Sequence, residues 1–187
     1  MKLVTFQTEA AFNKLQRKGY LIGTKKYIIP DFLKAYDWLR KQMNDKIGPS
    51  PLPDQYPIWA WYQGEDFDNL EARCEEIEIG HRGVRLEIEI DEKQVLLSDF
   101  ETWHMVLNNS YLAISEEDYD RFEDESKVNS DTTDRIEKSW ERIFDLDQIV
   151  DENWISPKEK KTIQATFWKL ELNQIKNVKW LDGTKKI

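Results

Sequence analysis

The stretch GVRLEIEIDEKQVLLSDFETWHMVLNNS, residues 83–110, places a strand, a shorter strand and a capped helix in succession. Apolar residues from Val84 to Ile90 alternate with charged ones, which predicts a strand with one buried face. Residues 95–97 predict the second strand. Ser98 followed three positions later by Glu101 is a capping box, so we predict that a helix begins there.

Outward from this stretch, the chain alternates short strands and helices. Residues 2–6 predict a first strand, Thr8 is a good N-cap for the helix that follows, and Gly19 supplies its C-terminal stop. Further elements are predicted at 20–22 (apolar), 27–29 (apolar), 30–43 (helix), 48–57 (proline-rich loop), 58–62 (aromatic strand), 66–79 (helix), from about 131 (helix) and 162–172 (strand). Residues 116–131 are acidic and poor in apolar side chains, which predicts a solvated loop that is a candidate mobile segment.

These elements indicate an α+β fold in a single domain spanning residues 1–187. We expect a small, mostly antiparallel split sheet flanked by helices. The length suits one domain with its own core. Cys74 is the only cysteine, no apolar run is long enough to cross a membrane, and the N-terminus lacks a signal sequence, so we expect a cytoplasmic protein with no membrane partner.

The net charge of −9 is unevenly spread along the chain. The balance is +6 over residues 1–50, −20 over residues 51–152 and +5 over residues 153–187. Two interpretations follow. The basic ends neutralise the acidic middle, or they meet in space and form a positive face for phosphates.

No strong catalytic motif is present, and with two histidines and one cysteine no metal is expected. His104 has two interpretations: a half-buried core residue bonded to backbone, or an acid–base group near neutral pH. Asp99 either caps the helix or lies beside a ligand at the helix start.

Two groups on predicted strands are candidates for ligand contact. Trp59 and Trp61 either pack in the core or stack on a base or nicotinamide. Gln164, Thr166 and Trp168 alternate on one side of the last strand, which is either its outer face or a polar inward face that needs partners.

Three segments resemble the ADP-ribosyltransferase fold, in particular the DNA-targeting toxin transferases of toxin–antitoxin systems. They are VTFQTEAAFNKLQRKGYL (residues 4–21), VLLSDFETWH (95–104) and KKTIQATFWKLELNQIKNV (160–178). The overall pattern also resembles an uncharacterised bacterial family of unknown function over most of the chain.

The transferase resemblance implies NAD as the candidate cofactor, with Thr5 and Gln7 holding it from the first strand. It places Gln164 and Thr166 at the position of the catalytic motif, with Asp99 and His104 at the rim of the site. The chain departs from that pattern because Thr166 stands where the family has its catalytic Glu, and a hydroxyl cannot stabilise an oxocarbenium-like transition state as a carboxylate does.

Two functions therefore remain as hypotheses. The first is a nucleotide- or NAD-binding protein, a candidate divergent transferase acting on nucleic acid or protein. The second is a non-enzymatic interaction protein, for example a phage or mobile-element factor that binds a host protein through the acidic middle of the chain. If Thr5, Gln7 and Gln164 do not share one cleft, the resemblance to the transferases is accidental.

Overall fold

The fold begins with a strand and a helix that follow the sequence prediction closely. The computed structural model describes residues 1–64, 77, 79–128, 131–148, 151 and 153–183. Strand β1 spans Lys2–Thr8 and helix α1 spans Glu9–Lys18. The Thr8 side chain accepts a hydrogen bond from the amide of Ala11, and Gly19 ends the helix with a left-handed φ of 80°. Both predicted caps are confirmed.

The other elements fall into two groups. The remaining strands are β2 (Tyr20–Thr24), β3 (Gln55–Tyr56), β4 (Ile58–Gln63), β5 (Arg82–Glu89), β6 (Leu96–Asp99), β7 (Ile163–Phe167), β8 (Lys169–Glu171) and β9 (Ile175–Asp182). The remaining helices are α2 (Leu33–Lys46), α4 (Phe100–Leu107), α5 (Glu116–Val128) and α6 (Thr133–Ser139). Short 3-10 turns are η1 (Lys25–Tyr27), η2 (Pro30–Phe32), η3 (Glu92–Gln94), η4 (Trp140–Phe144), η5 (Lys158–Lys160) and η6 (Leu172–Gln174).

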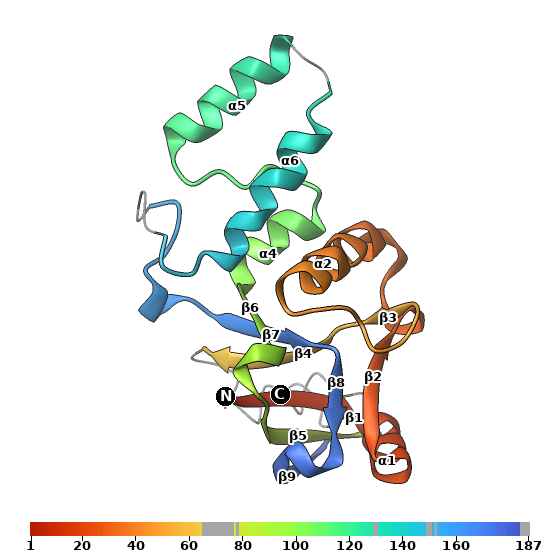
Figure 1. The fold of residues 1–187 in the computed structure, drawn as a ribbon. Helices are drawn as coiled ribbons and strands as arrows, with labels where there is room; N and C mark the ends of the chain where they lie inside the picture. The colour runs from red at the N-terminus through yellow and green to blue at the C-terminus, as the bar shows by residue number, and fades with distance from the viewer. Residues whose placement is uncertain (65–76, 78, 129–130, 149–150, 152, 184–187) are drawn as a thin grey trace.

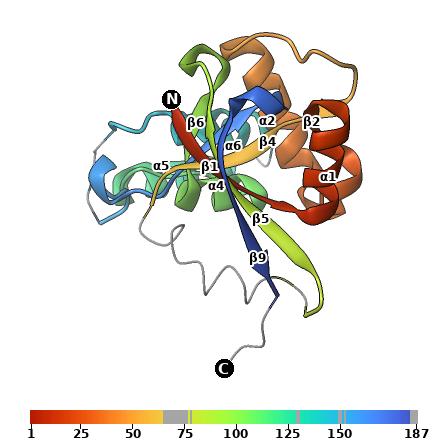
Figure 2. The ribbon, with the colours of Figure 1, turned by 90° about the horizontal axis from the view of Figure 1, so that it is seen from below.

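The strands form two antiparallel sheets. Six strands pair in the order β6-β7-β4-β1-β5-β9, and three pair in the order β3-β2-β8. Two continuous segments each contribute one strand to both sheets. In one, only Pro57 separates β3 from β4, and in the other, only Trp168 separates β7 from β8. β5 and β9 lie side by side and extend beyond the rest of their sheet (Figure 2). The α+β class with an antiparallel sheet flanked by helices is confirmed (Figure 1).

Each face of the large sheet carries its own core. On one face Leu86 and Phe167 pack with Phe12 and Leu15 of α1. On the other face Leu96 and Trp168 pack with residues of α2, α4 and η4, including the fully buried Trp140. Because side chains alternate along a strand, neighbouring residues of one strand belong to different cores.

Residues 116–128 differ from the sequence prediction, since they form helix α5 rather than a loop. Acidic residues in its first turn interact favourably with the positive end of the helix dipole. The Ser115 hydroxyl accepts a hydrogen bond from the amide of Asp118. Asp118 is the one residue of α5 that is buried among those whose side chains are described.

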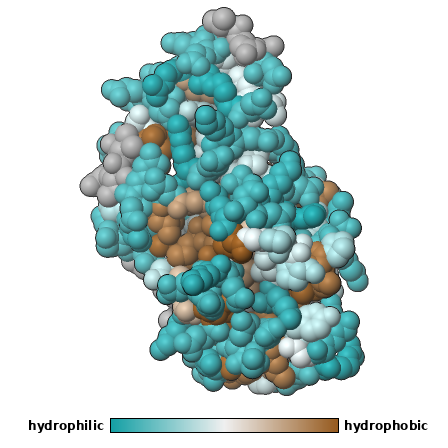
Figure 3. All heavy atoms as spheres, in the orientation of Figure 1, coloured by the Kyte–Doolittle hydropathy of each residue, from teal (hydrophilic) through white to brown (hydrophobic). Residues whose placement is uncertain are grey.

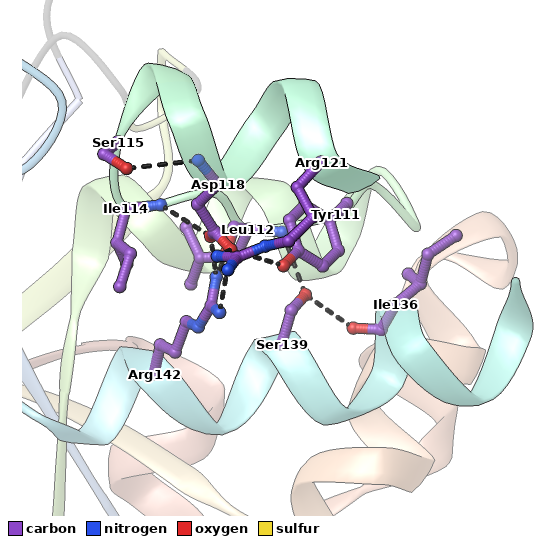
Figure 4. Close-up of polar contacts among 9 residues, drawn as sticks. All are labelled: Tyr111, Leu112, Ile114, Ser115, Asp118, Arg121, Ile136, Ser139 and Arg142. Atoms are coloured by element: carbon purple, nitrogen blue, oxygen red, sulfur yellow. Dashed lines mark hydrogen bonds and ion pairs between the residues drawn. The ribbon is translucent and has the colours of Figure 1, made fainter. Parts of the chain in front are cut away.

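A polar cluster around Asp118 attaches α5 to the rest of the molecule (Figure 4). The carboxylate forms an ion pair with Arg142 of η4 and accepts hydrogen bonds from the Tyr111 hydroxyl and the Ile114 amide. Arg142 also donates to the carbonyl of Leu112. The rings of Tyr111 and Phe122 stack beside this cluster with centroids 4.0 Å apart. A buried carboxylate, not an apolar stripe, therefore positions α5.

Two further predictions need correction. The N-cap of α4 is Asp99, not Ser98: its carboxylate accepts from the amides of Glu101 and Thr102, and the helix begins at Phe100. Either residue type caps well, so only the register of β6 decides between them. The last predicted strand is divided at Trp168 into β7 and β8. The helix predicted at 66–79 lies almost wholly outside the described residues.

Candidate functional site

The candidate site is a cleft where β1 and β4 separate. The two strands pair at a single position, Val4 with Trp61, before β1 continues into α1 and β4 joins back to β3. Just beyond that pair, the Thr5 hydroxyl donates to the Trp59 carbonyl at 2.7 Å. This side-chain bond takes the place of a ladder bond at the point where the large sheet splits.

The cleft has a volume of about 440 Å³, within the range of small-molecule sites. Its walls come from the end of β1, the first half of α1, strand β2 with η1, the β3–β4 segment, and Tyr36 of α2. Its aromatic lining residues are Phe6, Tyr27, Tyr36, Tyr56 and Trp59. Lys14 is the one charged residue among the described lining residues, and no carboxylate is among them.

The cleft contains few polar side chains, and a hydrogen bond within the protein fixes the orientation of Gln7. Gln7 donates from Nε2 to the Thr5 hydroxyl at 2.9 Å, and its carbamoyl oxygen has no partner within the described part of the chain. Burial raises the pKa of the Tyr36 phenol, and the neighbouring Trp59 indole opposes part of that rise. The phenol is therefore protonated at neutral pH and can donate to a ligand.

Gly23 allows the β2 wall to approach the β3–β4 segment closely. It pairs with Tyr56, and a Cβ added at this position would lie 2.4 Å from the Pro57 oxygen and 2.5 Å from the Tyr56 oxygen. Real Cβ atoms do not approach backbone oxygens so closely. The width of the cleft at this wall therefore depends on glycine, which has no Cβ, at position 23.

The residues that sequence analysis groups into one cleft lie on two faces of the sheet. Gln164 pairs with Trp61 and Ser98, and Trp59 pairs with Thr166, so these side chains share the face covered by α2 and α4. Thr5 and Gln7 alternate with Val4, the partner of Trp61, and therefore lie on the other face. At the split, Thr5 contacts Trp59 only through the backbone carbonyl, and Gln7 and Trp59 line the cleft. Gln164 and Thr166 lie beside the aromatic side chains of β4 on the opposite face and do not line the cleft, so the single cleft that the transferase resemblance requires is not found.

Gln164 and Thr166 are buried inward-facing residues, with exposures of 4% and 1%. The Thr166 hydroxyl donates to the Leu96 carbonyl at 3.2 Å, so its hydrogen-bonding capacity is used inside the protein. Gln164 Nε2 and Ser98 Oγ lie side by side in register, and neither has a hydrogen-bond partner among the described residues.

This arrangement predicts that Gln164→Leu is tolerated or stabilising. Removing a buried amide that makes no bond should raise the free energy of unfolding by about 1 kcal/mol. Urea denaturation followed by tryptophan fluorescence would measure it, with Thr166→Val as the comparison, because that change removes a bonded hydroxyl and should destabilise. A large loss of stability in Gln164→Leu would contradict the prediction.

Asp99 and His104 lie away from the cleft. Asp99 is 4% exposed, caps α4 and lies 3.6 Å from the Nζ of the equally buried Lys161. His104 is exposed on α4, where its Nδ1 lies 3.0 Å from the Phe100 carbonyl and its ring contacts the Phe100 ring edge-on. The expected half-buried position of His104 is therefore not what the structure shows.

Sequence reasoning missed several cleft residues, including Lys14, Gly23, Tyr27 and Tyr36. Tyr36 lies on the helical stripe of α2, which reads as core packing, and Gly23 lies in a short apolar strand without any turn signal. One signal in the sequence points to this wall: residues 10–30 contain basic residues, including Lys14, and no acidic ones.

A second cavity, of about 710 Å³, lies on the other side of the α1 N-terminus and shares Phe6, Gln7, Thr8 and Ala10 with the cleft. Its lining includes His81, Arg82 and Ile77, and the chain on either side of Ile77 lies outside the described residues. Within the described part of the chain, no three His, Cys, Asp or Glu side chains are placed to hold a metal ion. No described helix has the length and apolar character needed to cross a membrane.

Comparison with known proteins gives one result. A search of curated proteins and a search of solved structures each found no match. A family model for a domain of unknown function, DUF3841, matches residues 2–176. That match covers nearly the whole chain, including every residue that lines the cleft and all strands except most of β9, and the chain therefore belongs to the DUF3841 family.

Proposed function

We propose that this protein binds a nucleotide in the cleft where β1 and β4 separate, with NAD as the first candidate. The observation that carries the proposal is the lining of the cleft: aromatic side chains, an amide with a free carbonyl, one cation and no carboxylate among the described lining residues. Aromatic surfaces stack on planar bases, and the absence of acidic groups suits a ligand that carries negative charge.

The proposal concerns binding rather than transfer chemistry. In the resemblance to ADP-ribosyltransferases, Thr166 takes the place of the catalytic Glu. Its hydroxyl is bonded to the Leu96 carbonyl on the face of the sheet opposite Thr5 and Gln7. A turnover step through Thr166 is therefore not part of the proposal.

The test is titration with NAD by isothermal calorimetry. We expect Gln7→Ala to weaken binding roughly tenfold, because one hydrogen bond contributes on the order of 1 kcal/mol. Gln16→Ala is the matched control, since Gln16 is exposed on α1 and does not line the cleft. Absence of binding by the unchanged protein at millimolar NAD would overturn the proposal, as would equal effects of the two substitutions.

The second candidate is an interaction protein that uses α5. This helix carries seven acidic and two basic residues, and all of its described side chains except Asp118 are at least partly exposed. Figure 3 shows this end of the molecule covered by hydrophilic residues, whereas apolar residues gather midway down the same face. Two results together would favour this candidate. In a pull-down, the immobilised protein would capture a basic partner and a variant with reversed charges on α5 would not, and the unchanged protein would show no binding of NAD.

A further inference from the structure

After Glu9, the first residue of α1, the segment that continues through β2 and η1 carries only basic charges. Residues 10–30 contain five Lys or Arg and no Asp or Glu, in a chain whose net charge is −9. Those five residues are Lys14, Arg17, Lys18, Lys25 and Lys26. None of the five forms an ion pair with any residue that the structure describes, whereas Lys34, Arg82 and Lys158 elsewhere each do.

One of these cations lines the cleft, and two more lie in the chain between the lining residues Thr24 and Tyr27. Lys14 lines it from α1 and is half-buried. Lys25 and Lys26 are exposed in η1, the same turn that contributes Tyr27 to the lining. The Lys26 Nζ lies 5.6 Å from the Tyr27 ring centre, and Tyr27 is 79% exposed. Arg17 and Lys18 belong to the last turn of α1, away from the cleft lining.

The cleft therefore has an aromatic part and a basic part. Its lining holds uncharged aromatic groups such as Tyr36 and Trp59, and cations are added where η1 forms the wall. Lys25 and Lys26 are adjacent in η1, so two positive charges belong to the same short turn. Lysine ammonium groups are common ligands of phosphate, which they bind as mobile point charges.

We propose that the cleft recognises a nucleoside diphosphate, with the base against Tyr36 and Trp59 and the two phosphates held by Lys14, Lys25 and Lys26. This inference rests on the proposed nucleotide binding and names the part of the ligand that dominates recognition. It means that the diphosphate is the main determinant of affinity and that a nicotinamide ring is not required.

The experiment compares adenosine, ADP and NAD by calorimetry at low ionic strength, with the full chain. We expect ADP to bind at least tenfold more tightly than adenosine and about as tightly as NAD. Raising the salt concentration should weaken ADP and leave adenosine unchanged, because ionic contacts at an exposed site are screened.

Two variants locate the phosphate contacts. Lys14→Ala and the double change Lys25→Ala with Lys26→Ala should each reduce ADP affinity about tenfold and leave adenosine affinity unchanged. Lys179→Ala on β9 is the matched control: it removes one exposed cation at the far edge of the large sheet and should change neither affinity.

The outcomes separate this inference from the proposed function. Equal binding of adenosine and ADP would overturn the diphosphate inference and leave nucleotide binding standing. Binding of none of the three ligands would overturn both. An equal loss of ADP affinity in the Lys179 and Lys14 variants would also overturn the inference, because it would show a general effect of net charge. Unchanged far-ultraviolet circular dichroism and melting temperature would confirm that each variant is folded.

Discussion

Asp118→Ala should release helix α5 and lower the free energy of unfolding by roughly 3 kcal/mol, the lower end of the range for breaking a buried ion pair. The Asp118 side chain is 6% exposed and its Arg142 partner is 26% exposed, so the guanidinium left behind would regain only part of its hydration. The Tyr111 hydroxyl and the Ile114 amide would lose their acceptor in the same change.

The loss should be concentrated in α5. Because no other described side chain of this helix is buried, few apolar contacts remain to hold it once the carboxylate is gone. Hydrogen–deuterium exchange should show the α5 amides exchanging much faster, while the amides of β5 and β9 keep their protection. Urea denaturation would supply the global value.

Asp124→Ala is the control for Asp118→Ala. Asp124 lies on the same helix and pairs with Lys127 at 2.8 Å, but both side chains are largely exposed. Exposed pairs contribute between zero and about 1 kcal/mol, so this variant should be close to the unchanged protein. Similar exchange rates in α5 for both variants would contradict the assigned role of Asp118.

The same cluster predicts the direction of the pH dependence. Burial alone would raise the pKa of Asp118, but the hydrogen bonds from Arg142 and Tyr111 and the charge of Arg142 outweigh burial and lower it from its ordinary value of 3.8. A carboxylate whose pKa is lower in the folded state than in the unfolded state stabilises the fold fully when the pH is above its unfolded-state pKa. That stabilisation is lost as the pH falls through its folded-state pKa. We expect α5 to become labile below pH 3.8, and Asp118→Ala to remove that acid transition.

Sequence patterns predicted the parts of this fold that depend on local chemistry. The Thr8 cap, the Gly19 stop and the alternation from Val84 to Ile90 are decided by neighbours along the chain, and each has the predicted structure. Helix α5 was missed because its docking depends on Arg142, 24 positions from Asp118. A hydrophobic pattern cannot reveal a helix that is attached through a carboxylate.

The candidate site was predictable only in part, for a similar reason. Thr5, Gln7 and Trp59 were singled out from the sequence and lie together at the split. The resemblance assigns Gln164 and Thr166 to the same cleft as Thr5 and Gln7, but strand register places them, with the Trp59 side chain, on the opposite face from Thr5 and Gln7. Register depends on pairing between distant strands, and a shift of one residue exchanges the two faces of a strand.

Gly23→Ala should lower the free energy of unfolding by about 3 kcal/mol, the upper end of the usual cost of overpacking. The added methyl group would meet the backbone oxygens of Tyr56 and Pro57, which cannot rotate aside as a side chain can. Strand β2 would have to move away from β3, although Gly23 pairs with Tyr56 there.

The displacement should also reach the ligand. Tyr56 and Pro57 line the cleft, and the Tyr56 hydroxyl is bonded to Asp37 of α2 at 2.7 Å. A shift of the β2 wall would therefore separate the η1 lysines from the aromatic groups that we propose hold the base. We expect Gly23→Ala to weaken NAD or ADP binding at least tenfold at temperatures where the variant remains folded.

Gly19→Ala distinguishes this steric effect from a general loss of glycine flexibility. Gly19 precedes the same strand with a φ of 80°, and a Cβ there would meet nothing within 4 Å. The left-handed backbone should cost alanine about 1 kcal/mol without changing nucleotide affinity. Calorimetric titration of both variants decides the matter: if Gly23→Ala binds nucleotide as the unchanged protein does, the close approach of β2 to the β3–β4 segment does not set the width of the cleft.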